Sequence, residues 1–139
     1  YFNNDTETNK VIKNEWFHTG DAGYLDNNKY LFIKDRIKDV IISGGENIYP
    51  IEVENVLLRY PLVSEVAVIS APDNKWGEVV AAIVIPVKDF DKNFEKKLVD
   101  FCEDKLAKFK IPKKIIFRDS LPKNASGKVL KNELRNMFK

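Results

Sequence analysis

The sequence predicts an α+β fold in which a small, mostly antiparallel sheet is flanked by helices. From residue 39 onward, apolar runs typical of strands are interspersed with segments in which apolar residues recur every three or four positions, as in helices. These segments follow the order strand, helix, two strands, helix, strand, helix. The chain has 139 residues, of which 44% are hydrophobic and 32% charged, so it can form one core with a further short region.

The N-terminal part predicts short strands and no helix. Residues 1–14 are polar and show no clear period, so we expect a loop there. Residues 15–17, Glu-Trp-Phe, suit a short aromatic strand. Residues 22–26 and 29–34 fit the two arms of a hairpin, because the residues that join them, Asp-Asn-Asn, tolerate left-handed backbone.

The stretch from Lys34 to Glu54, KDRIKDVIISGGENIYPIEVE, contains a charged junction, a strand, a glycine pair and a helix start. The β-branched residues 40–42 suit a buried strand. The glycines that follow allow positive φ or a close approach to a ligand. Pro50 suits the first turn of a helix, where a missing N–H costs nothing. We expect this helix over residues 51–60, since Pro61 would end it.

The remaining elements follow from the same patterns. Residues 63–70 and 78–87 predict two strands separated by a polar turn. A helical stripe follows, made of Phe94, Leu98, Phe101, Cys102 and Leu106. Residues 113–118 predict a short strand, and residues 121–128, LPKNASGK, have the composition of a loop. A final short helix is expected with Leu130, Leu134 and Met137 or Phe138 along its seam.

The net charge of +2 conceals an uneven distribution. Residues 105–139 hold 11 Lys/Arg and 2 Asp/Glu, which gives +9, whereas the other residues hold 12 and 19, which gives −7. A basic end on an acidic body suggests a polyanionic partner such as a nucleotide, a phosphorylated cofactor or nucleic acid. A solvated helix face explains the same charges equally well.

Several classes of protein are disfavoured by composition. The single cysteine, Cys102, excludes an internal disulfide and is expected to pack as a small hydrophobe. The single histidine, His18, argues against a His-based metal centre or a Ser-His-Asp triad, so we expect no metal site. No apolar run approaches the roughly 18 residues of a membrane span. We expect a cytoplasmic protein, and the lack of an initiator Met suggests a piece of a longer polypeptide.

Two charged residues of the N-terminal part are candidates for nucleotide binding. Asp21 follows a tight turn at Gly20, where a carboxylate can accept two hydrogen bonds from a ribose diol. The alternative is an Asp that caps the turn, and spacing alone favours it. The Arg36 guanidinium suits phosphate or ribose oxygens. It would equally form an ion pair with Asp35 or Asp39, and spacing does not decide between these roles.

Two further features could contribute chemistry. The Ser-Gly-Gly run ending at Gly45 matches neither a P-loop nor a dinucleotide-binding motif, so taken alone it predicts a turn. Lys128, on a loop flanked by Ser and Gly, could neutralise charge on a phosphoryl or carboxyl oxygen. Most lysines in so basic a segment are solvated, and this is the alternative for Lys128.

Four motifs in their order give a more specific result: WFHTGDAGYLD, KDRIKDVIISGGENIYPIEVE, LAKFKIP and LPKNASGKVLK. Over almost its whole length the chain resembles the C-terminal part of the adenylate-forming superfamily. This superfamily includes acyl-CoA synthetases, adenylation domains of nonribosomal peptide synthetases, and luciferases. The GGENIYP run resembles the CoA-ligase branch, and the chain is identified as similar to an acyl-CoA synthetase or fatty-acid CoA ligase.

The resemblance implies a division of labour between two domains. A large N-terminal domain, absent here, would bind ATP and the carboxylic acid substrate. It would also provide most of the ligands of Mg²⁺. A small C-terminal domain would close over it and then rotate so that CoA can take the acyl group. Residues 1–37 would be a remnant of the large domain, expected to be poorly ordered or paired with another chain, and residues 38–139 the mobile domain. The fragment alone should be inactive.

The resemblance also assigns roles to individual residues. Asp21 would hold the ribose hydroxyls, Arg36 would support ribose and phosphate, and Lys38 would be the hinge. The CoA path would be lined by Gly44, Gly45 and Glu46. Lys128 would bridge the carboxylate and the α-phosphate during adenylation.

Two other functions remain open from the sequence. Within the superfamily, the chain could belong to an adenylation domain that loads a carrier-protein thiol. Outside it, the basic residues 105–139 could form a small nucleic-acid-binding module, although exposed aromatics suited to base stacking are not interleaved among them. The resemblance favours CoA as partner and argues against nucleic acid.

Overall fold

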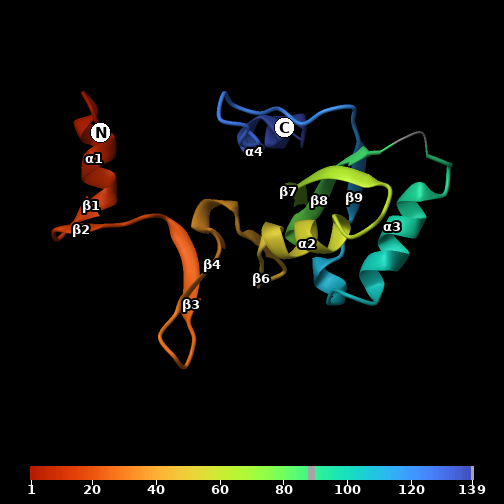
Figure 1. Ribbon diagram of the computed structural model, residues 1–139, viewed down its shortest axis with the longest axis horizontal. Coiled ribbons are helices and arrows are strands. Elements are labelled where there is room, and N and C mark those ends of the chain that lie inside the picture. The colour runs from red at the N-terminus through yellow and green to blue at the C-terminus, as the bar shows by residue number, and fades with distance from the viewer. Residues whose placement is uncertain (88–89, 139) are drawn as a thin grey trace. The chain divides into compact units, whose positions relative to one another are not determined.

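The structure, a computed structural model, describes residues 1–87 and 90–138 and divides into two compact units, Tyr1–Lys38 and Asp39–Lys139 (Figure 1). None of the described helices is long and apolar enough to cross a membrane. The second unit is the α+β domain that the sequence predicts, and the first is a string of small elements.

The first unit consists of one helix and two antiparallel hairpins. Helix α1 spans Asp5–Val11. Strand β1 (Ile12–Lys13) pairs with β2 (Trp16–Phe17), and β3 (Asp21–Leu25) pairs with β4 (Leu31–Arg36). The β3–β4 hairpin confirms the predicted arms, with Tyr24 stacked on Phe32 at 5.3 Å between ring centroids.

Helix α1 corrects the prediction of a loop over residues 1–14. The helix carries no apolar stripe, so hydrophobic periodicity could not reveal it. Its signals are at its ends: the Asn4 side chain accepts a hydrogen bond from the Glu7 N–H at 3.1 Å, and acidic residues occupy the first turn. An N-cap and charges that oppose the helix dipole favour this short helix locally.

We expected residues 1–37 to be poorly ordered or to pair with another chain. The part of this expectation that concerns pairing was wrong. The chain forms both hairpins by itself. They do not pack on a core, because no side chain in this unit is buried and many large apolar ones are exposed, among them Phe2, Trp16, Tyr30, Leu31 and Ile33.

The second unit is built on a five-stranded sheet. Its strands are β5 (Ile41–Ser43), β6 (Glu46–Ile48), β7 (Val63–Asp73), β8 (Gly77–Pro86) and β9 (Lys114–Phe117). The order is β6-β5-β8-β7, and β9 also pairs with β8. All pairs are antiparallel except β8–β9, which is parallel, so the predicted mostly antiparallel sheet is confirmed.

The described residues of the second unit and its junction also form three α-helices and three short 3₁₀ helices. The α-helices are α2 (Pro50–Leu57), α3 (Phe94–Glu103) and α4 (Lys131–Arg135). The 3₁₀ helices are η1 (Ile37–Asp39), η2 (Lys108–Lys110) and η3 (Asn136–Phe138). Helix α2 starts at Pro50 as predicted, but it ends three residues before the predicted Tyr60, in a tighter turn that precedes Pro61.

The sheet separates two apolar layers, because successive side chains of a strand point to opposite faces. Helices α2 and α3 cover one face, where Leu57, Phe94 and Leu98 are among the largest buried residues. Helix α4 covers the other face through Leu134, which packs with Ile69 and Ile83. Strand β8 is buried on both faces from Val79 to Ile85, which explains its uninterrupted apolar sequence.

The glycine pair forms a hairpin that the sequence analysis did not predict. We expected the chain to pass from the glycines directly into the helix, but β6 intervenes. Gly44 and Gly45 both have positive φ, +58° and +90°, and connect β5 to β6 as a two-residue turn. Such a turn needs positive φ at both positions, so adjacent glycines favour it over a loop.

Candidate functional site

The two candidate nucleotide-binding residues lie side by side. Asp21 and Arg36 face each other across the β3–β4 ladder. An Arg36 Nη1 donates to Asp21 Oδ1 at 3.0 Å and to the Thr19 carbonyl at 2.6 Å. Both side chains are partly exposed, so the pair adds little stability but fixes the orientation of the carboxylate.

The structure shows which of the local contacts raised as alternatives for these residues are formed. The turn before Asp21 is capped by Thr19 Oγ1, which accepts from the Asp21 N–H at 3.1 Å, so the Asp21 carboxylate is not the cap. The Arg36 guanidinium pairs with Asp21, and not with Asp39, whose carboxylate binds Arg135. Asp35 instead accepts from the Arg36 backbone N–H at 2.8 Å.

Lys38, the candidate hinge residue, is exposed and lies within η1. The boundary between the two compact units follows directly after it.

A cavity of about 270 Å³ adjoins the glycine hairpin. Its lining consists of Ser43, Gly44, Glu46, Trp76, Lys108, Phe109 and Lys113. Of the predicted CoA-path residues, Gly44 and Glu46 therefore line this cavity, whereas Gly45 is not among its lining residues.

Gly44 and Trp76 form one wall of this cavity. The Gly44 N–H donates to the Trp76 carbonyl at 3.0 Å, and a Cβ on Gly44 would come within 2.6 Å of the indole. Trp76 is held in turn by Asp73, whose carboxylate accepts from the backbone N–H groups of Trp76 and Lys75 at 2.9 Å. These N–H groups, that of Trp76 first, hold the pKa of Asp73 below its ordinary value.

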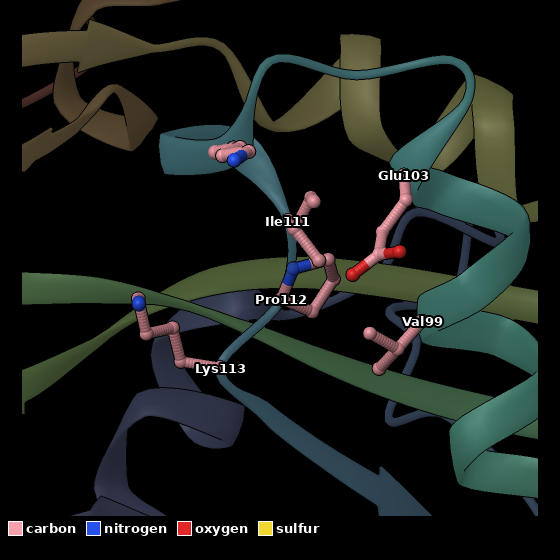
Figure 2. Close-up of a pocket in the computed structure, with 6 residues that line it drawn as sticks. Val99, Glu103, Ile111, Pro112 and Lys113 are labelled. Carbon is pink, nitrogen blue, oxygen red and sulfur yellow. The ribbon is translucent and has the colours of Figure 1, made fainter.

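A larger cavity of about 720 Å³ shares Lys108 and Lys113 with the first. Figure 2 shows Val99 and Glu103 projecting from α3 toward Ile111 and Pro112, with Lys113 pointing away from that helix. The shared lysines can attract phosphates, whereas the Glu103 carboxylate disfavours an anion at the α3 end.

Lys128 lies on a short loop closed by the bridge between Lys123 and Val129. Asn124 organises this loop: its Oδ1 accepts from the N–H groups of Ser126 and Lys128 at 3.1 and 2.9 Å and from the Ser126 hydroxyl at 2.8 Å. Gly127 turns the chain with a φ of +81°. The Lys128 side chain is exposed and forms no ion pair within the part of the chain that the structure describes.

The lysine loop and the glycine-bordered cavity lie toward opposite ends of β9. Residues 108–113, of which Lys108 and Lys113 line both cavities, lead into the first end of this strand. The chain leaves the other end toward the Lys128 loop and α4, drawn in blue in Figure 1. One rigid unit thus presents two different surfaces.

Sequence reasoning missed several residues of this site. Trp76 falls in the predicted polar turn between residues 70 and 78, and no role was predicted for Lys108, Phe109 or Lys113. The LAKFKIP motif was the available signal for Lys108 and Phe109, and Lys113 directly follows it. Asn124 was part of a motif, but its side-chain contacts are visible only in the folded loop. Among described residues, no group of His, Cys, Asp and Glu side chains could hold a metal ion.

These features define the small C-terminal domain of an adenylate-forming enzyme. Residues 52–128 match the family model described as the AMP-binding enzyme C-terminal domain. The chain belongs to this family.

Curated relatives of the chain are CoA ligases. It is 51% identical over 138 residues to the long-chain-fatty-acid–CoA ligase FadD13 of Mycobacterium tuberculosis, covering 99% of this chain and 27% of the relative. It is 50% identical over 137 residues to a 2-succinylbenzoate–CoA ligase of Bacillus cereus, covering 99% of this chain and 28% of the relative. The chain therefore spans little more than a quarter of each relative's length.

A solved structure agrees with these matches. The o-succinylbenzoate CoA synthetase of Bacillus subtilis, in complex with the acyl-adenylate intermediate OSB-AMP, superposes with a TM-score of 0.89 at 48% identity. The match covers 97% of this chain and 27% of that one.

Proposed function

We propose that the chain is the C-terminal part of an ATP-dependent acyl-CoA synthetase that activates a carboxylic acid as acyl-AMP and transfers the acyl group to CoA. The observation that supports this most directly is the near-complete match to two CoA ligases at 50–51% identity. One relative is named for a long-chain fatty acid and the other for 2-succinylbenzoate, so the proposal of a fatty acid substrate rests on the first relative alone.

In the first half-reaction, a carboxylate oxygen of the acid attacks the α-phosphorus of ATP, and pyrophosphate leaves. Arg36 binds one carboxylate oxygen of Asp21, which leaves the other oxygen available for a ribose hydroxyl. Lys128 would place its ammonium between the acid and the α-phosphate, where it offsets the negative charge that accumulates in the transition state. Mg²⁺, if bound mainly by the absent domain, would neutralise the phosphates further.

In the second half-reaction, the CoA thiol loses its proton and attacks the acyl carbon, and AMP leaves. The cavity beside Gly44 suits this acceptor, because its apolar wall of Trp76 and Phe109 fits a thin pantetheine arm. Lys108 and Lys113 at the border with the larger cavity offer two cations for the phosphates. The separation of this cavity from Lys128 favours rotation about Lys38 between the half-reactions.

The decisive experiment uses the full-length enzyme that contains this chain. Lys128→Ala should slow acyl-adenylate formation, measured as pyrophosphate release, by at least about 100-fold, the usual effect of removing one electrostatic stabiliser. Thioester formation from supplied acyl-adenylate and CoA should largely survive. Lys123→Ala is a matched control, because this lysine of the same loop is paired with Glu65. Equal loss of both half-reactions in Lys128→Ala would refute the assignment.

The two other functions are tested on the acceptor side. Calorimetry should detect CoA binding to the chain, and Lys113→Ala should weaken it. A carrier-protein loading domain would instead transfer the acyl group to a phosphopantetheinylated carrier and discriminate against free CoA. A nucleic-acid-binding module would shift oligonucleotides in a gel with strong salt dependence, which we do not expect. We also propose a cytoplasmic location, to be checked by fractionation of cells that produce the full-length enzyme.

A further inference from the structure

Asp39, the first residue after Lys38, contacts a residue near the C-terminal end of the second unit's sequence. An Arg135 Nη2 donates to Asp39 Oδ1 at 2.7 Å, joining positions 96 residues apart in sequence. The two side chains are only 21% and 13% exposed, in the order Arg135 and Asp39. A partly buried ion pair such as this one is screened less by salt than a surface pair, and its loss leaves a charge that is less well solvated than at the surface.

Helix α4, which carries Arg135, is held at several points. At its start, Lys131 binds the Glu54 carboxylate at 2.7 Å. On its inner side, Leu134 is 1% exposed and packs against the sheet. Asp39 is thus bound to a helix that cannot shift without disrupting the core of the unit.

The same helix is connected directly to the Lys128 loop. Only Val129 and Leu130 separate Lys128 from α4. Val129 packs on the apolar layer beneath α4, and the Leu130 N–H donates to the Pro122 carbonyl at 2.8 Å. A continuous series of contacts therefore runs from Asp39 through α4 to the backbone of Lys128.

We propose that the Asp39–Arg135 ion pair is a positioning contact that fixes where the hinge ends. Asp39 belongs to the rigid unit that carries Lys128, so the change in backbone angles during rotation is confined to Lys38 and the residues before it. Without the ion pair, flexibility would extend past residue 39, and each orientation of the unit would place the Lys128 ammonium less accurately. The catalytic part of this inference rests on the proposed function; the confinement of the flexible segment does not.

The confinement can be measured on the chain itself by limited trypsin digestion. Lys38 is exposed and offers a cleavage site at the proposed end of the hinge. Trypsin needs a locally opened backbone, so the cleavage rate reports how often the segment opens. Arg135→Ala should accelerate cleavage after Lys38 by about tenfold or more, and Arg135→Lys, which keeps the charge, should retain most of the protection. Arg135→Met serves as a second variant where alanine impairs folding.

A matched control separates local release from general destabilisation. Glu54→Gln weakens an ion pair of similar burial on the same helix, with side chains 18% and 11% exposed, but leaves Asp39 bound. It should lower the melting temperature without accelerating cleavage after Lys38. Equal acceleration in Glu54→Gln and Arg135→Ala, or none in Arg135→Ala, would overturn the confinement.

The positioning role is then tested in the full-length enzyme. Arg135→Ala should lower kcat of adenylation by about tenfold with little change in the KM for ATP, because a misplacement of about 1 Å affects chemistry more than binding. Arg135→Lys should recover most of this kcat. Faster cleavage with unchanged kcat would refute the positioning role. If the wild-type full-length enzyme forms no acyl-adenylate at all, the proposed function fails while the digestion result still decides the confinement.

Discussion

The buried carboxylate of Glu54 should contribute more to stability than other ionic contacts of similar appearance. Its Oε1 accepts from the Val68 N–H at 2.8 Å and from the Lys131 ammonium at 2.7 Å. Val68 lies on β7, whose other edge is paired with β8, so no strand among the described residues accepts from this N–H. Glu54 therefore connects α2, the sheet edge and α4.

Glu54→Ala removes both contacts at once. An unsatisfied buried N–H costs about 1–3 kcal/mol, and breaking a buried ion pair about 3–5 kcal/mol. The two contributions overlap, and the ion pair retains slight exposure, so we expect a loss of about 3 kcal/mol in the free energy of unfolding. Glu54→Gln can still accept from Val68, so it should lose only about 1–2 kcal/mol.

Urea unfolding followed by circular dichroism measures these differences. Fluorescence is less suitable, because Trp16 lies in the first unit and Trp76 in the second. Asp91→Asn is the exposed control: Asp91 and its partner Lys97 are 57% and 49% exposed, so it should cost less than about 1 kcal/mol. If Glu54→Ala lowers the free energy of unfolding no more than Asp91→Asn does, the reasoning is refuted. If Glu54→Ala and Glu54→Gln lower it equally, the hydrogen bond with Val68 contributes no stability.

Three further outcomes are expected. Gly44→Ala should destabilise the unit more than Gly45→Ala. Both residues have positive φ, but a Cβ at Gly44 would also meet the neighbouring indole at 2.6 Å, whereas Gly45 faces open space. The urea midpoints of the two variants measure this difference, and equal midpoints would contradict it. Burial raises the pKa of the Cys102 thiol from 9.0 to about 11. The unfolded thiol therefore ionises first, and the stability due to the neutral buried thiol is lost as the pH rises from about 9 to about 11, by up to roughly 1.4 kcal/mol per pH unit. Between about pH 8 and about pH 10 the wild type should therefore lose more free energy of unfolding than Cys102→Ala, and equal losses would contradict this. Asn124→Ala removes three accepted hydrogen bonds from the Lys128 loop, so adenylation by the full-length enzyme should slow while thioester formation from supplied acyl-adenylate is retained.

The long strands and the packed helices could be predicted because their sequences contain their own signal. Residues 78–87 form a β-branched apolar run, and β8 is buried on both faces as such a run requires. Helix α1 and strand β6 have no apolar pattern: one depends on the Asn4 cap, and the other on the pairing that the glycine turn imposes. Their stability comes from contacts that periodicity does not record.

The candidate site was predicted unevenly for a related reason. Asp21 and Arg36 were each identified, but their contact depends on the register of a hairpin with a bulge. Trp76 reaches the cavity beside Lys113 because β9 pairs in parallel with β8, and a parallel pair cannot be inferred from local sequence. Motifs identified the chemistry of the residues, whereas their proximity is a property of the sheet.

Part of the charge of the basic C-terminal segment has a third explanation, besides the two that were open at the start. Four of its cations bind carboxylates of the acidic body: Lys110 with Glu52, Lys123 with Glu65, Lys131 with Glu54 and Arg135 with Asp39. These ion pairs therefore connect the acidic and basic parts of one domain, because opposite charges that are far apart in sequence are close together in the fold.

This use of charge leaves a smaller set of cations for a polyanionic partner. Lys108 and Lys113 line cavities instead of pairing with carboxylates, and Lys128 extends from its loop without an ion pair in the described part of the chain. A general affinity for polyanions would have left the paired lysines free as well. Lys105, Lys114 and Arg118 contact the Phe101 carbonyl, the Pro72 carbonyl and the Met137 sulfur instead. Because Lys108, Lys113 and Lys128 lie at the two surfaces that the proposed half-reactions use, these three cations favour recognition of defined phosphates at each surface over non-specific binding of nucleic acid.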